Sequence, residues 1–230
     1  MLLVANGASK RFARSRNGSS HFYAVQPVDF TLEEGRLTCL LGRSGSGKTT
    51  FLNMMAGLAR PSEGTVTADG RDLYAMDDTA LSAFRARSFA VIPQGASGLG
   101  ALTVWENVLL PWSLRGEQAD EAYASALMER LGIQDLRDAF PGELSGGELK
   151  RMAIARALGC RAQVLFADEP TADLDEGNTR TVLELLRAEA ARGAAVLLVT
   201  HEREAERYAD VLLDMDAGVM NKFAHNGNSK

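Results

Sequence analysis

Cysteine and histidine are scarce in this sequence, which holds two cysteines and three histidines among 230 residues. Cys39 and Cys160 each stand in an apolar stretch, which favours reduced core residues over a disulfide or a metal pair. His21, His201 and His225 are too scattered to match a zinc-ligand spacing. The sequence thus excludes a disulfide-stapled scaffold and carries no zinc motif.

The sequence also has no excess of positive charge and no long apolar run. The 25 Lys and Arg residues are outnumbered by 30 Asp and Glu residues, and no long basic stretch exists beyond Lys10–Arg16. Because nucleic-acid binding needs a basic footprint, we expect no nucleic-acid partner. No apolar run approaches the ~18 residues of a membrane span, and the amino end has no signal-peptide pattern, so we expect a cytoplasmic protein.

With 46% hydrophobic residues, the chain is long enough for one α/β core with a small appended lobe. We expect no separate domain after Leu213, and a polar tail over Asn221–Lys230.

One segment matches the phosphate-binding pattern G-x-x-x-x-G-K-[ST] at every fixed position. Its residues are Gly42, Arg43, Ser44, Gly45, Ser46, Gly47, Lys48 and Thr49, followed by Thr50. Glycines let successive backbone N–H groups face one phosphate, and the lysine reaches the β- and γ-phosphates. The Thr49 hydroxyl is a ligand for Mg²⁺. The segment therefore predicts ATP or a related nucleotide with Mg²⁺ as cofactors.

The flanks of this motif fit its required setting of a strand before and a helix after. Leu37–Leu41 is an apolar run typical of a buried strand, and Thr50–Ala56 has apolar spacing typical of a helix. Gly57 is suited to end that helix in a left-handed conformation.

Two later segments add groups for phosphoryl transfer. Val164–Asp168 is a buried-type strand that delivers Asp168 and Glu169 at its carboxyl end, where α/β sheets keep their ligand crevice. We expect Asp168 to hold the Mg²⁺ shell and Glu169 to act as the general base on water. The second segment is Ser145, Gly146, Gly147 and Glu148 at the start of a helix, which makes a second anion site. One chain needs only one γ-phosphate site, so this motif is expected to act on the nucleotide of a partner subunit.

Together these segments resemble the ATP-binding subunit of ATP-binding cassette (ABC) transporters, whose hallmark L-S-G-G-Q lies between the two Walker elements. The resemblance spans nearly the whole chain and implies a homodimer, or a pair with a second ABC subunit, bound to transmembrane permease subunits at the cytoplasmic face of a membrane. It also implies further site residues. Gln94 resembles the glutamine that senses Mg²⁺ and the γ-phosphate, Ala172–Asp175 the D-loop, and His201 the histidine that donates to the γ-phosphate.

The aromatic that stacks on adenine is expected to be Phe12, with Tyr23 as the rival. Three residues depart from the family pattern. Glu148 replaces the usual glutamine and places a negative charge near the partner's nucleotide, Pro93 precedes Gln94, and Glu202 follows His201. None of these changes removes a catalytic group, so we expect a working ATPase.

The fold implied is α/β, with a P-loop NTPase (RecA-like) core, an antiparallel β-subdomain and an inserted α-helical subdomain. We assign residues 1–93 and 148–230 to the β-subdomain and core, and 94–147 to the helical subdomain. The first strand is expected at a sheet edge, followed by a loop over Ser15–Ser20. Tyr123, Leu127 and Leu131 recur at four-residue spacing, which predicts a helix.

The stretch Leu102–Trp112 resembles the segment that receives a permease helix in the family, and Trp112 is the preferred contact residue. This stretch and the insertion Asp77–Arg87 look most like the lipoprotein-release and macrolide-efflux branch. Two other functions stay open: an ATPase that signals through a membrane partner to cell-wall or division enzymes, and a soluble ABC ATPase without a membrane partner.

Overall fold

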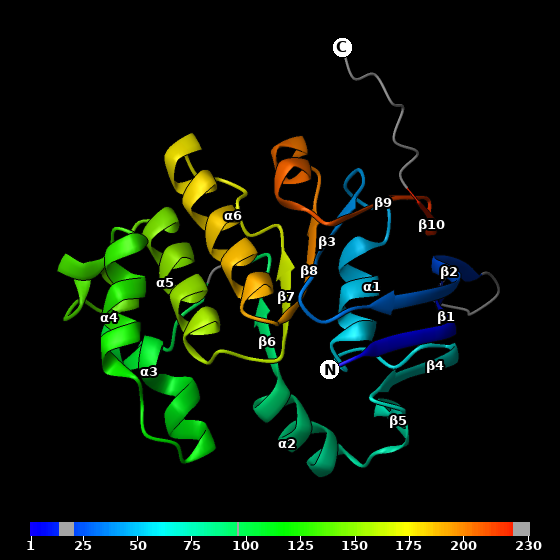
Figure 1. Cartoon of the computed structure of the whole chain (residues 1–230), viewed down its shortest axis with the longest axis horizontal. Coiled ribbons are helices and arrows are strands. Elements are labelled where there is room, and N and C mark those ends of the chain that lie inside the picture. Colours follow the sequence, from blue (N-terminus) through cyan, green and yellow to red (C-terminus); the bar gives the residue numbers. More distant parts are fainter. Residues whose placement is uncertain (14–20, 96, 223–230) are drawn as a thin grey trace.

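The computed structural model describes residues 1–13, 21–95 and 97–222. The expected loop over Ser15–Ser20, His225 and most of the expected polar tail lie outside the described residues. Two sheets organise the rest of the chain. In Figure 1 the larger sheet lies at the centre, α3, α4 and α5 lie on one side of it, and α1 separates it from the smaller sheet on the other.

The larger sheet has the strand order β10-β9-β3-β8-β7-β6. Its strands β9, β3, β8, β7 and β6 are parallel, and β10 pairs antiparallel with β9. The bounds are β3 Leu37–Leu41, β6 Phe89–Ile92, β7 Val164–Asp168, β8 Ala195–Thr200, β9 Val211–Asp216 and β10 Val219–Lys222. The strands predicted before the phosphate loop and before the carboxylate pair are thus confirmed.

Buried strands in this sheet face two separate cores. Along β7, Leu165 and Ala167 pack with the helices α3 to α6, whereas Val164 and Phe166 pack with α1 and the smaller sheet. This alternation follows from the two-residue period of a strand, and it explains why both faces are apolar. The carboxyl ends of the strands form the edge of the sheet at which α/β folds bind ligands.

The smaller sheet is antiparallel and has the order β2-β1-β4-β5. Its strands are β1 Leu3–Ala13, β2 His21–Leu32, β4 Glu63–Ala68 and β5 Arg71–Asp72. The antiparallel β-subdomain is confirmed, but the prediction of an edge position for the first strand is wrong. β1 lies inside the sheet, because the largely exposed segment β4 pairs with its second side.

The helices are α1 Lys48–Met55, α2 Asp78–Ser88, α3 Val104–Arg115, α4 Glu121–Arg130, α5 Gly146–Gly159 and α6 Glu176–Ala191. Short 3-10 helices cover Leu73–Ala75, Gln134–Leu136, Pro141–Glu143 and Arg203–Tyr208. The region predicted as a helical subdomain contains α3 and α4, and α5 packs on both of them and on β6. The predicted boundary between residues 147 and 148 therefore falls in the first turn of α5. None of the helices among the described residues combines the length and the apolar character needed to cross a membrane.

Candidate active site

The phosphate loop connects β3 to α1, and close backbone contacts require two of its glycines, Gly42 and Gly47. At Gly47, where φ is 109°, an added Cβ would lie 2.0 Å from the Ala24 carbonyl oxygen. At Gly42 an added Cβ would lie 2.4 Å from the Met215 carbonyl oxygen. Any larger residue would push β2 or β9 away from the loop. The helix predicted after the loop begins at Lys48, and Gly57 follows its end with φ of 68°, as expected.

Lys48 lies buried at the centre of the loop, with 5% of its surface exposed. Its Nζ donates to the carbonyl oxygens of Gly42 at 2.7 Å and Arg43 at 3.1 Å. The same ammonium lies 3.6 Å from Glu169 Oε1. The loop carbonyls thus fix the position of the lysine, and its positive charge lies beside the carboxylate of the expected catalytic base.

A cleft of about 490 Å³ opens in front of Lys48. It brings together Phe12 and most of the phosphate-loop residues predicted to bind ATP. Its lining comprises Phe12, Phe22, Tyr23, Ala24, Ser44, Gly45, Gly47, Lys48, Thr49, Thr50, Gln94, Glu169, Ala217 and Gly218. Both candidates for stacking on adenine line the cleft, and the guanidinium of Arg11 lies over the Tyr23 ring at 5.7 Å. Sequence reasoning missed Phe22, Ala24 and the Ala217–Gly218 turn, which reach the cleft only through the pairing of strands.

The residues predicted to hold Mg²⁺ fit that ion. Thr49 Oγ1 donates to Asp168 Oδ1 at 3.1 Å, so a hydroxyl and a carboxylate already share one point at the end of β7. Burial, and then the negative charge of Glu169, raise the pKa of Asp168. A cation there would offset both effects. Two protein oxygens suit Mg²⁺ bound to nucleotide phosphates, because this ion keeps water and phosphate as its other ligands. Gln94 is exposed at the rim of the same cleft.

Glu169 adopts a strained backbone conformation, with φ of 45° for a residue that has a Cβ. Its amide donates to the Val199 carbonyl oxygen at 2.9 Å, which continues the pairing of β7 with β8. Its Oε2 accepts from Thr200 Oγ1 at 3.0 Å and contacts His201 Nδ1 at 2.9 Å. The predicted base therefore contacts His201, the residue predicted to donate to the γ-phosphate. The structure also adds Thr200 to the site.

The segment after Glu169 is held by two side chains that sequence reasoning missed. Lys150, buried in α5, donates through Nζ to the Ala172 carbonyl oxygen at 2.7 Å, and burial lowers its pKa. Thr171 Oγ1 donates to Glu202 Oε2 at 2.5 Å, so Glu202 anchors the expected D-loop beside His201. The sequence does not single out Lys150, because α5 also contains Arg151 and Arg156.

The Ser-Gly-Gly motif does not reach the cleft of its own chain, since none of its residues lines it. Ser145 is the N-cap of α5, and Glu148 closes a capping box with it. Glu148 Oε2 accepts from the Ser145 amide at 2.8 Å and from Ser145 Oγ at 2.7 Å. These bonds hold the pKa of Glu148 below its usual range. The replacement of glutamine by Glu148 therefore occupies both donors of the serine.

A separate apolar groove of about 250 Å³ lies between α2 and β6 on one side and α3 and α5 on the other. Leu110, Pro111 and Leu114 of α3 line it, and Leu114 is 74% exposed. The preference for Trp112 as the contact residue is wrong. Trp112 is 7% exposed, because its ring packs against Gly159 of α5, where an added Cβ would lie 2.9 Å from it.

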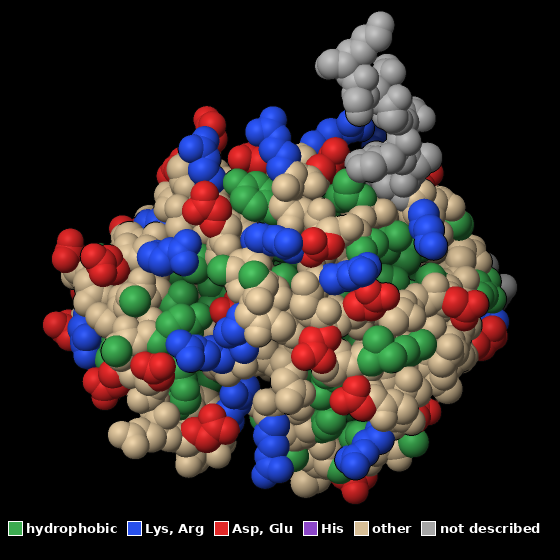
Figure 2. All heavy atoms as spheres, in the orientation of Figure 1, with side chains coloured by type: hydrophobic (Ala, Val, Ile, Leu, Met, Phe, Trp, Pro, Cys, Tyr) green, Lys and Arg blue, Asp and Glu red, His purple; other side chains and the backbone are tan. Residues whose placement is uncertain are grey.

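On the face shown in Figure 2, basic and acidic side chains are interspersed over most of the surface.

Comparisons with known proteins agree with this geometry. Residues 25–172 match the family described as ABC transporter. The methionine import ATP-binding protein MetN of Rhizobium meliloti is 40% identical over 88% of this chain, which spans only 57% of that protein. The lipoprotein-releasing system ATP-binding protein LolD of Chromohalobacter salexigens is 35% identical, with 91% of this chain and 90% of LolD covered.

Among solved structures, the dimeric bacterial ABC transporter cassette MJ0796 superposes with a TM-score of 0.87 at 28% identity, covering 96% of this chain and 98% of MJ0796. The same cassette is also known as a dimer in a post-hydrolysis state bound to ADP and Pi.

Proposed function

Because this chain belongs to the ABC transporter family and is therefore an ATPase, we propose that it is the ATP-hydrolysing subunit of a membrane transporter in which two cassettes close around ATP and move a permease. The observation that carries the proposal is that Lys48, Thr49 and Glu169 line one cleft and that Asp168 accepts a hydrogen bond from Thr49. These are the groups that phosphoryl transfer to water requires.

The proposed reaction follows from the contacts of these residues. Lys48 exchanges its loop carbonyls for the β- and γ-phosphates, and the backbone N–H groups of the loop bind the same oxygens. Thr49 and Asp168 would hold Mg²⁺, which would neutralise charge on the phosphates. Glu169 takes a proton from the attacking water, and His201, already in contact with Glu169, donates to the γ-phosphate.

The proposed pairing of two cassettes rests on the position of Ser145. Its motif lies at the start of α5, away from the cleft of its own chain, so it serves a nucleotide only across an interface. The dimeric structures of MJ0796 support such an arrangement. In a dimer of this kind, ATP supplies part of the contact surface, and its hydrolysis loosens the pair.

We assign the permease contact to the groove beside α3. Its lining is apolar, open and rimmed by Arg115 and Arg156, which suits an amphipathic helix. We propose that this contact lies at the cytoplasmic face of a membrane, and the import and release functions named for the relatives support this. We expect the transporter to export or extract a lipoprotein, a peptide or a drug-like compound. The direction of transport and the class of cargo depend on the permease.

The proposal is tested by capturing partners from gently solubilised native membranes with the Glu169→Gln chain and ATP. We expect a stoichiometric multi-span protein, and we expect Leu114→Asp in the same background to lose it. Leu2→Asp, which changes an exposed leucine just before β1, is the control and should retain the partner. Recovery of only soluble, ribosomal or nucleic-acid components would overturn the transporter assignment. A multi-span partner without a transport path would indicate the signalling function instead.

Replacing Glu148 by glutamine is expected to tighten the ATP-dependent dimer by about threefold to tenfold. Removing the carboxylate frees the Ser145 donors from a charged acceptor and removes repulsion of the partner's γ-phosphate. The dimer dissociation constant in the Glu169→Gln background, measured by analytical ultracentrifugation, checks this.

Glu106→Gln is the matched control, because Glu106 forms the same capping box with Thr103 at the start of α3. Both changes weaken a helix N-terminus to a similar extent. An unchanged or weaker dimer with Glu148→Gln would contradict this role for the carboxylate.

A further inference from the structure

Residues 97–103, here called the connector, join the segment of Gln94 to α3. Several connector residues are exposed, and Leu99 is 52% exposed, so packing alone does not fix its path. Asn107 of α3 does. Its side chain is fully buried, its Oδ1 accepts from the Leu99 amide at 2.8 Å, and its Nδ2 donates to the carbonyl oxygens of Leu99 at 3.1 Å and Leu102 at 3.0 Å. A short side chain with both a donor and an acceptor is needed to bind both polar groups of one backbone residue.

Arg156 of α5 holds the same connector from its other end. Its NH2 group donates to the Ser97 carbonyl oxygen at 2.9 Å, and NH1 lies 3.5 Å from Asn107 Oδ1. Arg156 also lines the apolar groove beside α3. Gly98 fits closely between these elements, because an added Cβ would lie 2.7 Å from Met152 of α5. The connector is therefore fixed to the helix that begins at Ser145.

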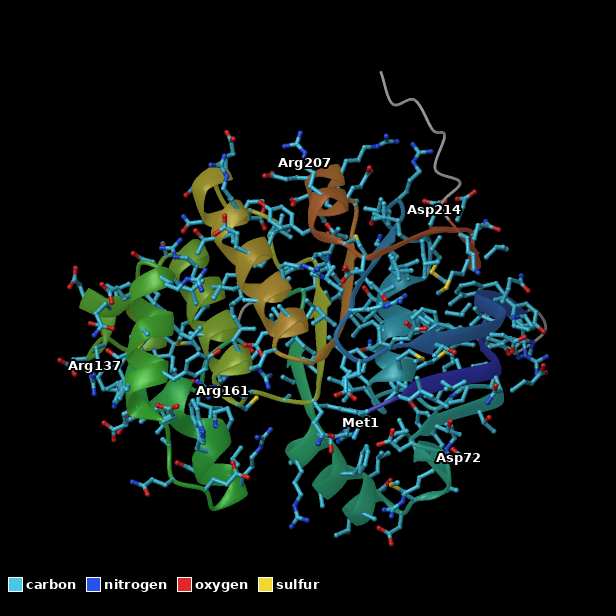
Figure 3. All side chains as sticks on the ribbon, in the orientation of Figure 1. Met1, Asp72, Arg137, Arg161, Arg207 and Asp214 are labelled. Carbon is cyan, nitrogen blue, oxygen red and sulfur yellow. The ribbon has the colours of Figure 1, made fainter. Side chains whose placement is uncertain are left out.

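The amino end of α3 is itself held in place, so Asn107 is a firm anchor. The Val104 amide donates to the Ala139 carbonyl oxygen at 2.8 Å, and the Trp105 amide donates to the Arg137 carbonyl oxygen at 3.0 Å. The Arg137 guanidinium also stacks on the Trp105 ring at 3.4 Å. Figure 3 shows Arg137 at the outer edge of the helical group. These contacts tie α3 to the segment just before the Ser145 motif.

We propose that Asn107, together with Arg156, is a positioning residue for Gln94 that links the nucleotide cleft to the groove beside α3. Three residues span at most roughly 11 Å, so fixing Ser97 confines where Gln94 can lie at the rim of the cleft. Any shift of α3 by a helix in the groove moves Asn107, and with it the connector. The inference rests on the proposed function for the roles of Gln94 and the groove.

A double-mutant cycle on the ATP turnover of the purified chain tests this. Asn107→Asp keeps the shape of the side chain but removes the donors to the connector carbonyls. We expect kcat to fall about tenfold and KM for ATP to stay within about threefold, because Asn107 lies outside the cleft. Combined with Gln94→Ala, it should lower kcat by no more than about twofold beyond the stronger single change, since both act through one group.

A residue that only supports the fold would lower turnover independently of Gln94. The proposal would therefore be overturned if the decrease in kcat of the double variant equalled the product of the two single decreases. An unchanged kcat in Asn107→Asp would also overturn it. Arg156→Lys provides a second arm that keeps the charge but not both bonds, and it should be non-additive with Gln94→Ala in the same way. Asn221→Asp, on β10, is the control and should leave kcat unchanged. The cycle needs no membrane partner, so failure of permease capture and failure of this inference are separate results.

Discussion

Replacing Glu169 by glutamine is expected to lower the rate of ATP hydrolysis by a factor of about 100 to 10,000, the range that a positioned general base contributes. Glutamine has the same shape and still accepts from Thr200 and His201, so the end of β7 should keep its structure. It also removes a negative charge that raises the pKa of Asp168 and that would repel the phosphates of ATP. ATP should therefore bind and remain unhydrolysed.

Two measurements check this expectation: phosphate release at saturating Mg-ATP, and molar mass by light scattering with and without ATP. We expect turnover to be lost and an ATP-dependent dimer to accumulate. Glu202→Gln is the matched control, because Glu202 belongs to the same network but contacts Thr171 and lies outside the cleft. If the Glu169→Gln chain and the unchanged chain hydrolysed ATP at equal rates, Glu169 would not be the general base.

Much of this site is predictable from sequence because its parts are local. The phosphate loop, its preceding strand β3 and its following helix α1 lie within one short stretch, and each imposes its own residue pattern. The same is true of β7 with Asp168 and Glu169, where a continuous apolar run identifies a strand covered on both faces. The family resemblance, now confirmed, added Gln94 and His201, whose residue types alone predict nothing specific.

The missed features all depend on contacts between distant parts of the chain. Lys150 and Ala172 are 22 residues apart, and their hydrogen bond joins α5 to the segment that follows β7. The interior position of β1 follows from pairing with β4, a segment whose first three residues are exposed and which carries no continuous apolar run. Trp112 was misjudged for a related reason. Its burial depends on a glycine 47 positions later, at Gly159, that leaves room for the ring.

Removing the ammonium of Lys48 is expected to weaken ATP binding by about 100-fold, which corresponds to about 2.7 kcal/mol. Lys48→Met keeps the apolar stem but leaves the Gly42 and Arg43 carbonyl oxygens without their donor and Glu169 without its counter-charge. The phosphates then lose their main cationic contact inside the cleft and meet an uncompensated carboxylate. Isothermal titration calorimetry with ATP in EDTA, where turnover is blocked, measures the affinity directly.

Lys150→Met is the matched control for this experiment. Both lysines are 5% exposed and both donate to backbone carbonyl oxygens, but Lys150 does not line the cleft. Both changes should lower the free energy of unfolding by about 1–3 kcal/mol, because each removes the partner of a buried polar group. Only Lys48→Met should weaken ATP binding beyond about threefold. Equal losses of affinity in the two variants would mean that Lys48 acts through the fold of the loop and not through contact with the phosphates.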